Sequence, residues 1–475
     1  MTYRLCALVF SLILAVSISS ALGFSKVYPK VRSVPLDGDP GEPLFLTPLL
    51  KAGKFKEARD KALVTPLKGA ETVVSYSGYF TVDEAFNSNM FFWFFPAESN
   101  YLNAPVVLWL QGGPGATSLF GLFTENGPLL VKTNQVLSTR QYTWSKSHNL
   151  IYIDNPVGTG FSFTDADDGF SRNQTAVGKN LYSALLQFFD LFPELVKNEF
   201  YVTGESYAGK YVPAISYTIH KENPTASLKI NFQGMAIGNG LIDPEHMLHY
   251  GDYLYQLGLI DINARAEFHK QEQQGIDAIK QGQWDKAFAV FDGLINGDLT
   301  TQPALFKNLT GFDFYFNYLH SKDPADADPT ADFGTFVQTA VVRKSIHVGN
   351  RTFGGTEAQK VEEFLQQDVM KSVRPWIQEI LEKYRVLIYN GQLDIIVAYP
   401  LTLGALRALE WSAQGEYAQA PRYQWYVGSE LAGFVKTAGK LTEVLVRNAG
   451  HMVPGDQPRW GMDLIQRFTQ NKPFH

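Results

Sequence analysis

Cysteine is almost absent from this sequence: Cys6 is the only one among 475 residues. Cys6 falls in an N-terminal segment that we expect to be removed, so the mature protein would contain neither a thiol nor a disulfide. This excludes a cysteine nucleophile and a zinc site built from cysteines. A chain of this length can bury a large hydrophobic core without disulfide cross-links.

Apolar stretches long enough to cross a bilayer are also missing after the N-terminus. There, Arg4 precedes the apolar run Leu5–Ile18, and Ala21-Leu22-Gly23 is a small-x-small cleavage pattern. Together they predict a signal peptide over residues 1–23, because the run is short for a membrane anchor and ends in small residues. We therefore expect no membrane span and a location in the secretory pathway, either secreted or in the lysosomal or endosomal lumen.

Basic runs and cofactor motifs are missing too. The formal net charge is −6 and no lysine or arginine cluster stands out, so nucleic acid is not an expected partner. His246 and His249 are spaced for one helical face, but no third ligand or H-E-x-x-H motif accompanies them. The Gly-Gly-Pro-Gly stretch from Gly112 lacks the lysine of a phosphate loop and the spacing of a dinucleotide fingerprint. No metal or other cofactor is therefore expected.

The sequence does contain short apolar or β-branched runs that end at glycine-rich turns. Near-continuous apolar strands are typical of a parallel sheet that is buried on both faces. Between two of these runs, apolar residues recur every three to four positions from Val177 to Leu191, which predicts a helix that ends before Pro193. The expected strands are Val106–Leu110, Leu150–Ile153, Phe200–Thr203, Met235–Ile237, Val386–Tyr389 and Val444–Val446.

Alternating strands and helices predict an α/β fold with a mostly parallel central sheet and helices on both faces. From residue 241 to residue 363 the composition changes to a charged helical stretch, followed by "HSKDPADADPTADFG". We interpret residues 241–363 as a helical cap insertion with a loop, placed between core segments 24–240 and 364–475. The loop Asp323–Asp332 is polar and rich in proline, so it is a candidate site for proteolytic cleavage.

A serine stands at a sharp turn in "YVTGESYAGKYVPA", which begins at Tyr201. A strand, a glycine, Ser206 and a following helix are typical of the nucleophile elbow of α/β-hydrolases. The usual pattern is G-x-S-x-G; here Ala208 takes the last position and is still small. The helix that follows presents backbone N–H groups to an anion. Ser206 is therefore the candidate nucleophile.

An acid and a histidine follow in the order that α/β-hydrolases use. Asp394 comes just after the strand Val386–Tyr389, and His451 follows the strand Val444–Val446 on a loop with glycine. His451 would take the proton of Ser206, and Asp394 would orient the imidazole and stabilise its charged form. Each residue alone could be a helix cap or a polar loop residue, whereas the three in this order favour a catalytic triad.

Backbone donors for an oxyanion hole are expected in "QGGPGATSLFGLFTENGP", which directly follows a strand. Glycines let the backbone approach a substrate carbonyl closely. The N–H groups of Gly113 and Tyr207 are the expected pair.

With these motifs the sequence resembles the serine carboxypeptidases, a family of lysosomal, vacuolar and secreted exopeptidases with the α/β-hydrolase fold. The resemblance covers almost the whole mature chain. Within the family, the motifs of this sequence are most similar to those of the vitellogenic-like carboxypeptidases. It implies a serine-type carboxypeptidase that releases C-terminal amino acids at acidic pH through an acyl-enzyme, with peptide or protein C-termini as partners. The matching blocks are "YSGYFTV", "FFWFFPAES", "LWLQGGPGATSLFGLFTENGP", "IYIDNPVGTGFSF", "GESYAGKYVP", "YNGQLDIIV" and "AGHMVPGDQP".

The resemblance also implies how a free C-terminus would be recognised. Glu205, together with Glu125 and Gln111, would bind the terminal carboxylate of the substrate, because two adjacent carboxyls share a proton and a neutral acid donates to a carboxylate. Trp109 lies beside Gln111 and is expected to support the same pocket. The family commonly has asparagine at the position of Gln111 and a disulfide-forming cysteine where this chain has Ala116, so another contact must brace that loop.

A pocket for the leaving residue would match Phe120 and Met452, whose apolar side chains favour hydrophobic C-terminal residues; both could instead be ordinary core residues. Glycosylation is expected at the sequons of Asn173, Asn308 and Asn350. Two alternative functions remain open: an esterase or acyltransferase that uses the same triad, and a stored or chaperone-like binding protein. The sequence also leaves open whether the protein forms a homodimer.

Overall fold

A computed structural model of the chain describes residues 36–297, 302–354 and 356–475. The predicted signal peptide, residues 1–23, lies outside the described residues, and so does Cys6. Among the described residues, no helix combines the length and the apolar character that a membrane span needs.

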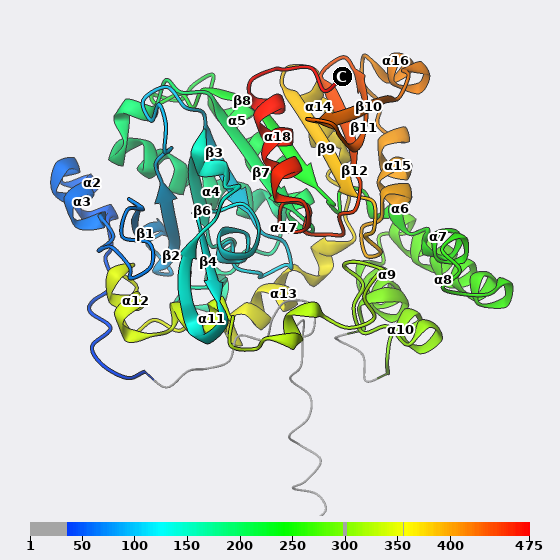
Figure 1. The fold of residues 1–475 in the computed structure, drawn as a ribbon, viewed down its shortest axis with the longest axis horizontal. Coiled ribbons are helices and arrows are strands. Elements are labelled where there is room, and N and C mark those ends of the chain that lie inside the picture. The colour runs from blue at the N-terminus through cyan, green and yellow to red at the C-terminus, as the bar shows by residue number, and fades with distance from the viewer. Residues whose placement is uncertain (1–35, 298–301, 355) are drawn as a thin grey trace, which may run out of the picture.

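A ten-stranded mixed sheet forms the centre of the molecule, in the order β1-β2-β6-β3-β7-β8-β9-β12-β11-β10 (Figure 1). The run from β6 to β12 is parallel, and the strands at both edges are antiparallel. The sheet strands are β1 (Tyr76–Asp83), β2 (Ser88–Phe95), β3 (Val106–Leu110), β6 (Asn149–Ile153), β7 (Phe200–Glu205), β8 (Phe232–Gly238), β9 (Arg385–Gly391), β10 (Tyr423–Val427), β11 (Glu430–Ala438) and β12 (Leu441–Val446).

The parallel centre of the sheet consists of the six strands that the sequence predicts. This confirms the expected α/β fold with a mostly parallel sheet. The antiparallel edge strands β1, β2, β10 and β11 were not predicted. A separate hairpin of β4 (Leu129–Lys132) and β5 (Val136–Thr139) forms a small second sheet.

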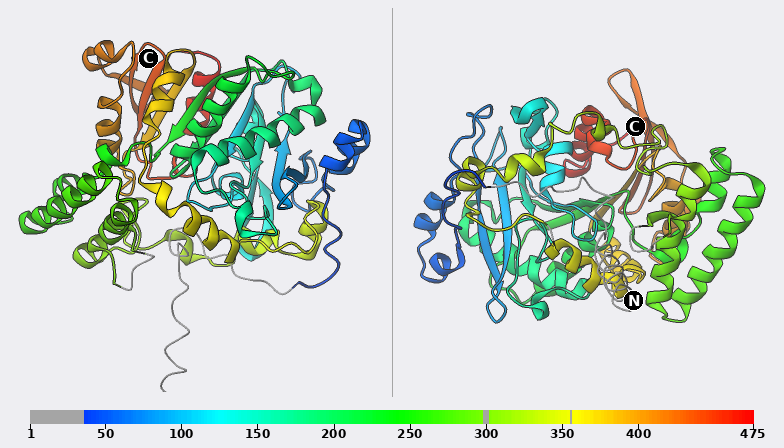
Figure 2. Two further views of the ribbon diagram at one scale, coloured as in Figure 1. Left: turned by 180° about the vertical axis from the view of Figure 1, so that it is seen from behind. Right: turned by 90° about the horizontal axis from the view of Figure 1, so that it is seen from below.

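Both faces of the sheet are buried, and successive residues of one strand enter different hydrophobic cores. Leu108 and Leu110 of β3 belong to one core, whereas Val107 and Trp109 belong to the other. The first core includes α4 (Gln174–Leu191), α5 (Ala208–Glu222) and α14 (Arg374–Leu381), and the second includes α18 (Pro458–Thr469). Figures 1 and 2 show α18 on the opposite side of the sheet from α4 and α5.

Between β8 and β9 the chain leaves the sheet, and this excursion contains the predicted cap insertion. α7 to α10 project at the lower right of Figure 1, α11 and α12 lie at the lower left, and α13 lies between the two groups. α13 runs across residue 363, the expected end of the insertion. The helices of the excursion before α14 are α6 (Pro244–Met247), α7 (Tyr250–Gln256), α8 (Ile262–Lys280), α9 (Trp284–Phe291), α10 (Leu305–Thr310), α11 (Phe333–Val337), α12 (Ala340–Ser345) and α13 (Thr356–Val369).

The remaining helices are short and lie at the two ends of the core. α2 and α3 precede the first strand, α15 and α16 join β9 to β10, and α17 begins two residues after His451. Their bounds are α2 (Thr47–Lys51), α3 (Phe55–Ala62), α15 (Tyr399–Arg407), α16 (Gln414–Gln419) and α17 (Val453–Asp456).

The helix that carries the serine elbow, α5, packs closely against α4. At the contact, Gly178 of α4 faces the backbone of α5: a Cβ placed there would lie 2.8 Å from the carbonyl oxygen of Ala214 and 2.4 Å from Thr218 Oγ1. A backbone oxygen cannot move aside as a side chain can. The position of α5 behind the sheet therefore depends on the missing side chain at residue 178.

We expect Gly178→Ala to destabilise the protein by about 1–3 kcal/mol, because the added methyl group overpacks the contact between α4 and α5. The measurement is the midpoint of thermal unfolding. Gly415→Ala in α16 is the matched control, since no atom lies within 4 Å of a Cβ there. This variant should be neutral or more stable by about 0.4–1 kcal/mol through the unfolded state. Equal midpoints for the two variants would contradict the close contact.

Candidate active site

Ser206 occupies the turn between β7 and α5, as the elbow motif predicts. Its backbone is in the left-handed region with φ of +65°, which a non-glycine residue adopts only when the surroundings hold it there. The Ser206 N–H donates to the carbonyl of Gly238 at 3.1 Å, and its carbonyl accepts from the N–H of Gly209 at 2.9 Å and of Leu241 at 3.0 Å. The side chain is half-buried, so the hydroxyl is presented on a rigidly held turn.

Asp394 and His451 lie side by side beyond the ends of β9 and β12, which are neighbouring parallel strands. His451 Nδ1 lies 2.8 Å from Asp394 Oδ2, and both side chains are fully buried. A proton on Nδ1 donates to the carboxylate, which leaves Nε2 as the acceptor nitrogen. Within the described part of the chain, Nε2 has no hydrogen-bond partner. The imidazole can therefore take a proton from an incoming hydroxyl while Asp394 holds its other nitrogen.

Asn239 is a member of this cluster that the sequence analysis missed. Its Nδ2 donates to Asp394 Oδ2 at 2.7 Å, and its Oδ1 accepts from the N–H of Gly391 at 3.1 Å. Asn239 thus ties the carboxylate to the end of β9. The signal in the sequence was a polar residue between two glycines, in "GNG", directly after the predicted strand Met235–Ile237.

The glycine loop after β3 lies against the serine elbow. A Cβ on Gly112 would come within 2.5 Å of the Tyr207 nitrogen and 2.7 Å of Ser206 Cβ, so only glycine permits this approach. Within the described residues, neither the N–H of Gly113 nor that of Tyr207 donates to a protein acceptor. Two backbone donors therefore remain available beside the serine hydroxyl.

Asp154 braces this loop through hydrogen bonds. Its carboxylate accepts from Thr117 Oγ1 at 2.5 Å, from the N–H of Ser118 at 3.0 Å and from the N–H of Phe161 at 2.9 Å. Burial raises the pKa of the Asp154 carboxyl to about 7. A buried acid thus braces the loop that contains Ala116 by hydrogen bonds to Thr117 and Ser118.

Glu205, the residue before Ser206, is completely buried and contacts Gln111. Gln111 Nε2 donates to Glu205 Oε1 at 3.0 Å, and Gln111 Oε1 accepts from Trp109 Nε1 at 2.9 Å. Trp109 therefore fixes the orientation of the amide, as expected. Gln111 also lies directly opposite Glu205, because the parallel register of β3 and β7 pairs Leu110 with Gly204.

Glu125 completes this group from a short π-helical turn, Gly121–Glu125, and is also fully buried. No N–H or hydroxyl group in the described chain donates to either oxygen of Glu125 or to Glu205 Oε2. Glu125 and Glu205 do interact with each other as a carboxyl pair. A proton held between the two carboxyls supplies the hydrogen bond that their surroundings lack.

The protonation of this pair follows from its burial. Burial raises the pKa of Glu125 to about 7 and the pKa of Glu205 well above the ordinary range, and the charge of Glu125 raises the pKa of Glu205 further. A neutral carboxylic acid therefore lies next to the serine at acidic pH. Such a group can donate a hydrogen bond to a carboxylate ligand.

The two residues expected to line a leaving-residue pocket are mostly covered. Phe120 is 8% exposed and packs edge-on against Phe333 of α11, with ring centroids 6.1 Å apart. Met452 is half-buried and packs against both cores. Both side chains pack in apolar surroundings. Phe120 directly precedes the turn that carries Glu125, and Met452 directly follows His451 in the chain.

The other residues singled out in the sequence lie away from this centre. His246 Nδ1 contacts Asp243 Oδ2 at 2.7 Å, and the described residues contain no group of three or more side chains that could hold a metal ion. The sequon residues Asn173, Asn308 and Asn350 are all exposed, which glycosylation requires. Asn173 also caps α4 through its Oδ1, and this leaves the nitrogen that a glycan would modify directed away from the helix N–H.

Comparison with protein-family models matches residues 66–471 to the family described as serine carboxypeptidase. Three curated relatives align over most of the chain. A venom serine carboxypeptidase of Apis mellifera is 59% identical over 96% of this chain and 97% of its own. A vitellogenic carboxypeptidase of Aedes aegypti is 49% identical over 91% of each chain. The probable serine carboxypeptidase CPVL of Homo sapiens is 47% identical over 94% of each chain.

Among solved structures, the prohormone-processing carboxypeptidase Kex1Δp of Saccharomyces cerevisiae has a similar fold. It superposes with a TM-score of 0.69 at 21% identity and covers 87% of this chain and 96% of its own. At this level of identity the similarity supports the shared fold only, and the chemistry is inferred from the residues of the site.

A fluorophosphonate probe, which reacts with activated serine hydroxyls, is expected to label Ser206 and no other serine. His451→Ala should slow labelling by several orders of magnitude, because the hydroxyl loses its base. Asn239→Ala should slow it by about tenfold, since Asp394 loses one of its two hydrogen-bond donors. Mass spectrometry of the labelled peptides identifies the serine that reacts, and the rate of labelling is compared between the variants and the unmodified protein.

Asn231→Ala is the matched control, because Asn231 lies at the opposite end of β8, where its Nδ2 donates to Lys197 O at 2.9 Å. This variant should be labelled at the rate of the unmodified protein. Labelling that persists after Ser206→Ala would show that another serine is the reactive one.

Proposed function

The chain belongs to the serine carboxypeptidase family, and we propose that Ser206, His451 and Asp394 are its catalytic triad. As a member of this family it is a hydrolase that removes amino acids from the C-termini of peptides. The triad assignment is supported by the strained turn at Ser206 and by the 2.8 Å contact between His451 and Asp394.

In the proposed reaction, Ser206 Oγ attacks the carbonyl of the last peptide bond while His451 Nε2 takes the hydroxyl proton. Asp394 and Asn239 hold the imidazole so that its Nδ1–H stays on the carboxylate side. The N–H groups of Gly113 and Tyr207 stabilise the oxyanion. His451 then gives its proton to the leaving amino group, the amino acid departs, and water hydrolyses the acyl-enzyme by the same route.

Recognition of a free C-terminus is the role we propose for Glu125, Glu205 and Gln111. The observation that carries this proposal is the fully buried carboxyl pair that includes the residue before the nucleophile, because burial favours the protonated form of both acids. A protonated acid and the amide of Gln111 can donate to a terminal carboxylate, whereas an internal peptide bond offers no such anion. Because Trp109 fixes the amide, the longer side chain of Gln111 still directs its nitrogen toward Glu205.

A preference for hydrophobic leaving residues is proposed from Phe120 and Met452. Their apolar surroundings favour an apolar side chain and disfavour a charged one, which would lose its hydration. The ring of Phe333 against Phe120 adds an apolar wall from α11.

A location in the secretory pathway, with glycans at Asn173, Asn308 and Asn350, is also proposed. It is supported by the predicted signal peptide and by the exposure of all three asparagines. The Asp323–Asp332 loop is largely exposed, so it remains our candidate for proteolytic maturation. Its polar residues lie on the chain between α10 and α11, outside the central sheet.

The decisive test compares a peptide that has a free C-terminus with its C-terminally amidated twin. The protein should release one residue from the free acid and should act much more slowly on the amide, because only the free acid offers a carboxylate to the acid pair. Ser206→Ala should abolish release by several orders of magnitude while peptide binding is retained. Products are followed by mass spectrometry. Equal turnover of both peptides would contradict recognition of the free C-terminus, and activity on esters alone would instead indicate an esterase.

The acid pair also predicts two pH profiles from one enzyme. The pair binds a carboxylate best while both carboxyls are protonated; Glu125 has a pKa of about 7, so it becomes charged as pH rises through that value while Glu205 keeps its proton, and the incoming carboxylate then meets a negative charge. KM for free-acid peptides should therefore climb on the alkaline side. A C-terminally blocked substrate escapes this penalty and needs only a neutral His451, which higher pH favours. Its optimum should lie at a higher pH than that of the free acid.

Glu205→Gln is expected to narrow the gap between the two optima, because an amide donates at every pH. The difference between the two optima is an internal control for Asp154, whose carboxyl also has a pKa of about 7. Asp154 braces the loop for both substrates, so its ionisation shifts both pH profiles together and leaves the difference unchanged. If the two substrates share one optimum and Glu205→Gln moves neither profile, the pair does not read the C-terminus.

A further inference from the structure

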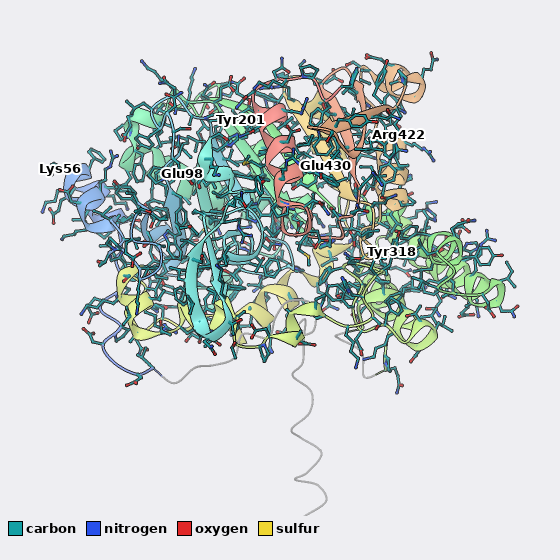
Figure 3. The ribbon with its side chains drawn as sticks, viewed as in Figure 1. Lys56, Glu98, Tyr201, Tyr318, Arg422 and Glu430 are labelled. Carbon is teal, nitrogen blue, oxygen red and sulfur yellow. The ribbon has the colours of Figure 1, made fainter. Side chains whose placement is uncertain are left out.

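One segment outside the central sheet contacts both loops that carry the proposed acid and base. This aromatic segment, residues 312–320, follows α10 and contains three aromatic residues in succession, Phe314, Tyr315 and Phe316. Tyr318 marks its position in Figure 3, at the end of the sheet from which α7 to α10 project. The sequence analysis assigned no role to these residues.

Backbone hydrogen bonds join the aromatic segment to the Asp394 loop and to the His451 loop. On the acid side, the N–H of Ile395 donates to the carbonyl of Tyr315 at 3.1 Å, and the N–H of Tyr318 donates to the carbonyl of Leu393 at 2.9 Å. On the base side, the N–H of His451 donates to the carbonyl of Phe316 at 2.7 Å. The two loops also contact each other directly, since the N–H of Leu393 donates to the carbonyl of Ala449 at 2.8 Å, and the aromatic segment adds a second connection between them.

The ring of Phe316 covers the imidazole of His451. The two ring centroids are 4.8 Å apart and the planes are inclined by 32°, so the π face of the phenyl ring lies toward the imidazole. Phe316 is itself 6% exposed and packs edge-on against Phe314, with centroids 5.5 Å apart. The imidazole of His451 therefore has two neighbours: the carboxylate of Asp394 at its Nδ1 and the ring of Phe316 beside it.

We propose that Phe316 is a positioning residue for His451, holding the imidazole against Asp394 and stabilising it when it carries the proton of Ser206. The proposal rests on the assignment of His451 as the base. A phenyl face attracts a cation through its quadrupole, and the interaction grows when water is excluded. The same ring limits rotation of the imidazole, so Nδ1 stays against Asp394 and Nε2 stays free to accept a proton.

Other charged groups act on His451 and must be separated from the effect of Phe316. Asp394 contacts the imidazole directly, and Glu125 lies close enough for its charge to interact with His451. Asp456 accepts from the N–H of Gly450 at 2.6 Å, and His320 lies near Asp456. Phe316→Leu leaves all of these groups in place and changes only the ring.

The experiment measures kcat/KM against pH with a C-terminally blocked ester, so that carboxylate binding by the Glu125–Glu205 pair does not enter. The acidic limb of this profile reports protonation of His451 in the free enzyme. Phe316→Leu keeps an apolar cover but removes the π face, so the charged imidazole is less stabilised. The acidic limb should move to lower pH by about half a unit, and kcat should fall about threefold to tenfold.

Phe314→Leu is the matched control, because it removes a phenyl ring of the same segment, one that packs edge-on against Phe316 and lies near His320. Its acidic limb should stay where it is. Phe316→Tyr retains the aromatic face and should keep the original limb even if the added hydroxyl lowers activity. This second variant keeps the test usable if Phe316→Leu folds poorly.

An unchanged acidic limb in Phe316→Leu, or an equal shift in Phe314→Leu, would overturn the proposal, because a purely structural role lowers activity without moving the limb. Failure of the triad assignment is recognised separately. If His451→Ala is still labelled by the fluorophosphonate at the original rate, the base is wrong; if labelling is lost but the limb does not move in Phe316→Leu, only the role of Phe316 is wrong.

Discussion

The parallel pairing of β3 with β7 aligns Leu110 with Gly204, and the rest of the site depends on this register. One residue further, Gln111 faces Glu205 and donates to it at 3.0 Å. One more residue brings Gly112 against Ser206 and Tyr207, where any side chain would collide. A slip of one residue would turn every side chain to the other face of the sheet and separate all three pairs. Carboxylate recognition, the nucleophile and the backbone donors are thus consequences of one strand pairing.

The buried acids of the site differ in the groups that surround them. Asp394 receives hydrogen bonds from His451 and Asn239, and Asp154 receives three from the loop that it braces. Glu205 receives only the amide of Gln111, and Glu125 faces Glu205. Removing a carboxyl from water disfavours its charged form, and burial raises the pKa of both Asp154 and Glu125 to about 7. In the pair, the charge of Glu125 raises the pKa of Glu205 further. The pair therefore retains a proton, and that proton allows two acidic side chains to bind a third carboxylate.

The aromatic segment and Asn239 show how the acid and base loops reach one geometry. β9 and β12 bring the two loops to neighbouring strand ends, and the N–H of Leu393 joins them directly by donating to the carbonyl of Ala449 at 2.8 Å. The carbonyl of Phe316, which accepts from the N–H of His451, and the amide of Asn239, which donates to Asp394, add further contacts. A base that is already oriented loses less entropy on reaching the transition state, which is why contacts outside the reacting atoms matter for rate.

Much of this protein was determined by local sequence. Short apolar runs that end at glycine identified the six central strands, because buried parallel strands need apolar residues on both faces. The elbow around Ser206, and the order of Ser206, Asp394 and His451, were also readable, since turn chemistry and chain order are local properties. The antiparallel edge strands were not found: β10, for example, leaves Tyr423 and Tyr426 exposed and has an irregular register after Trp425, so its apolar residues do not alternate regularly. Only the tertiary structure decided that Asp154 braces the glycine loop, that Asn239 holds Asp394, and that Phe316 covers His451. These contacts join residues far apart in the chain, and each is worth only about 1 kcal/mol, so no periodic pattern marks them in the sequence.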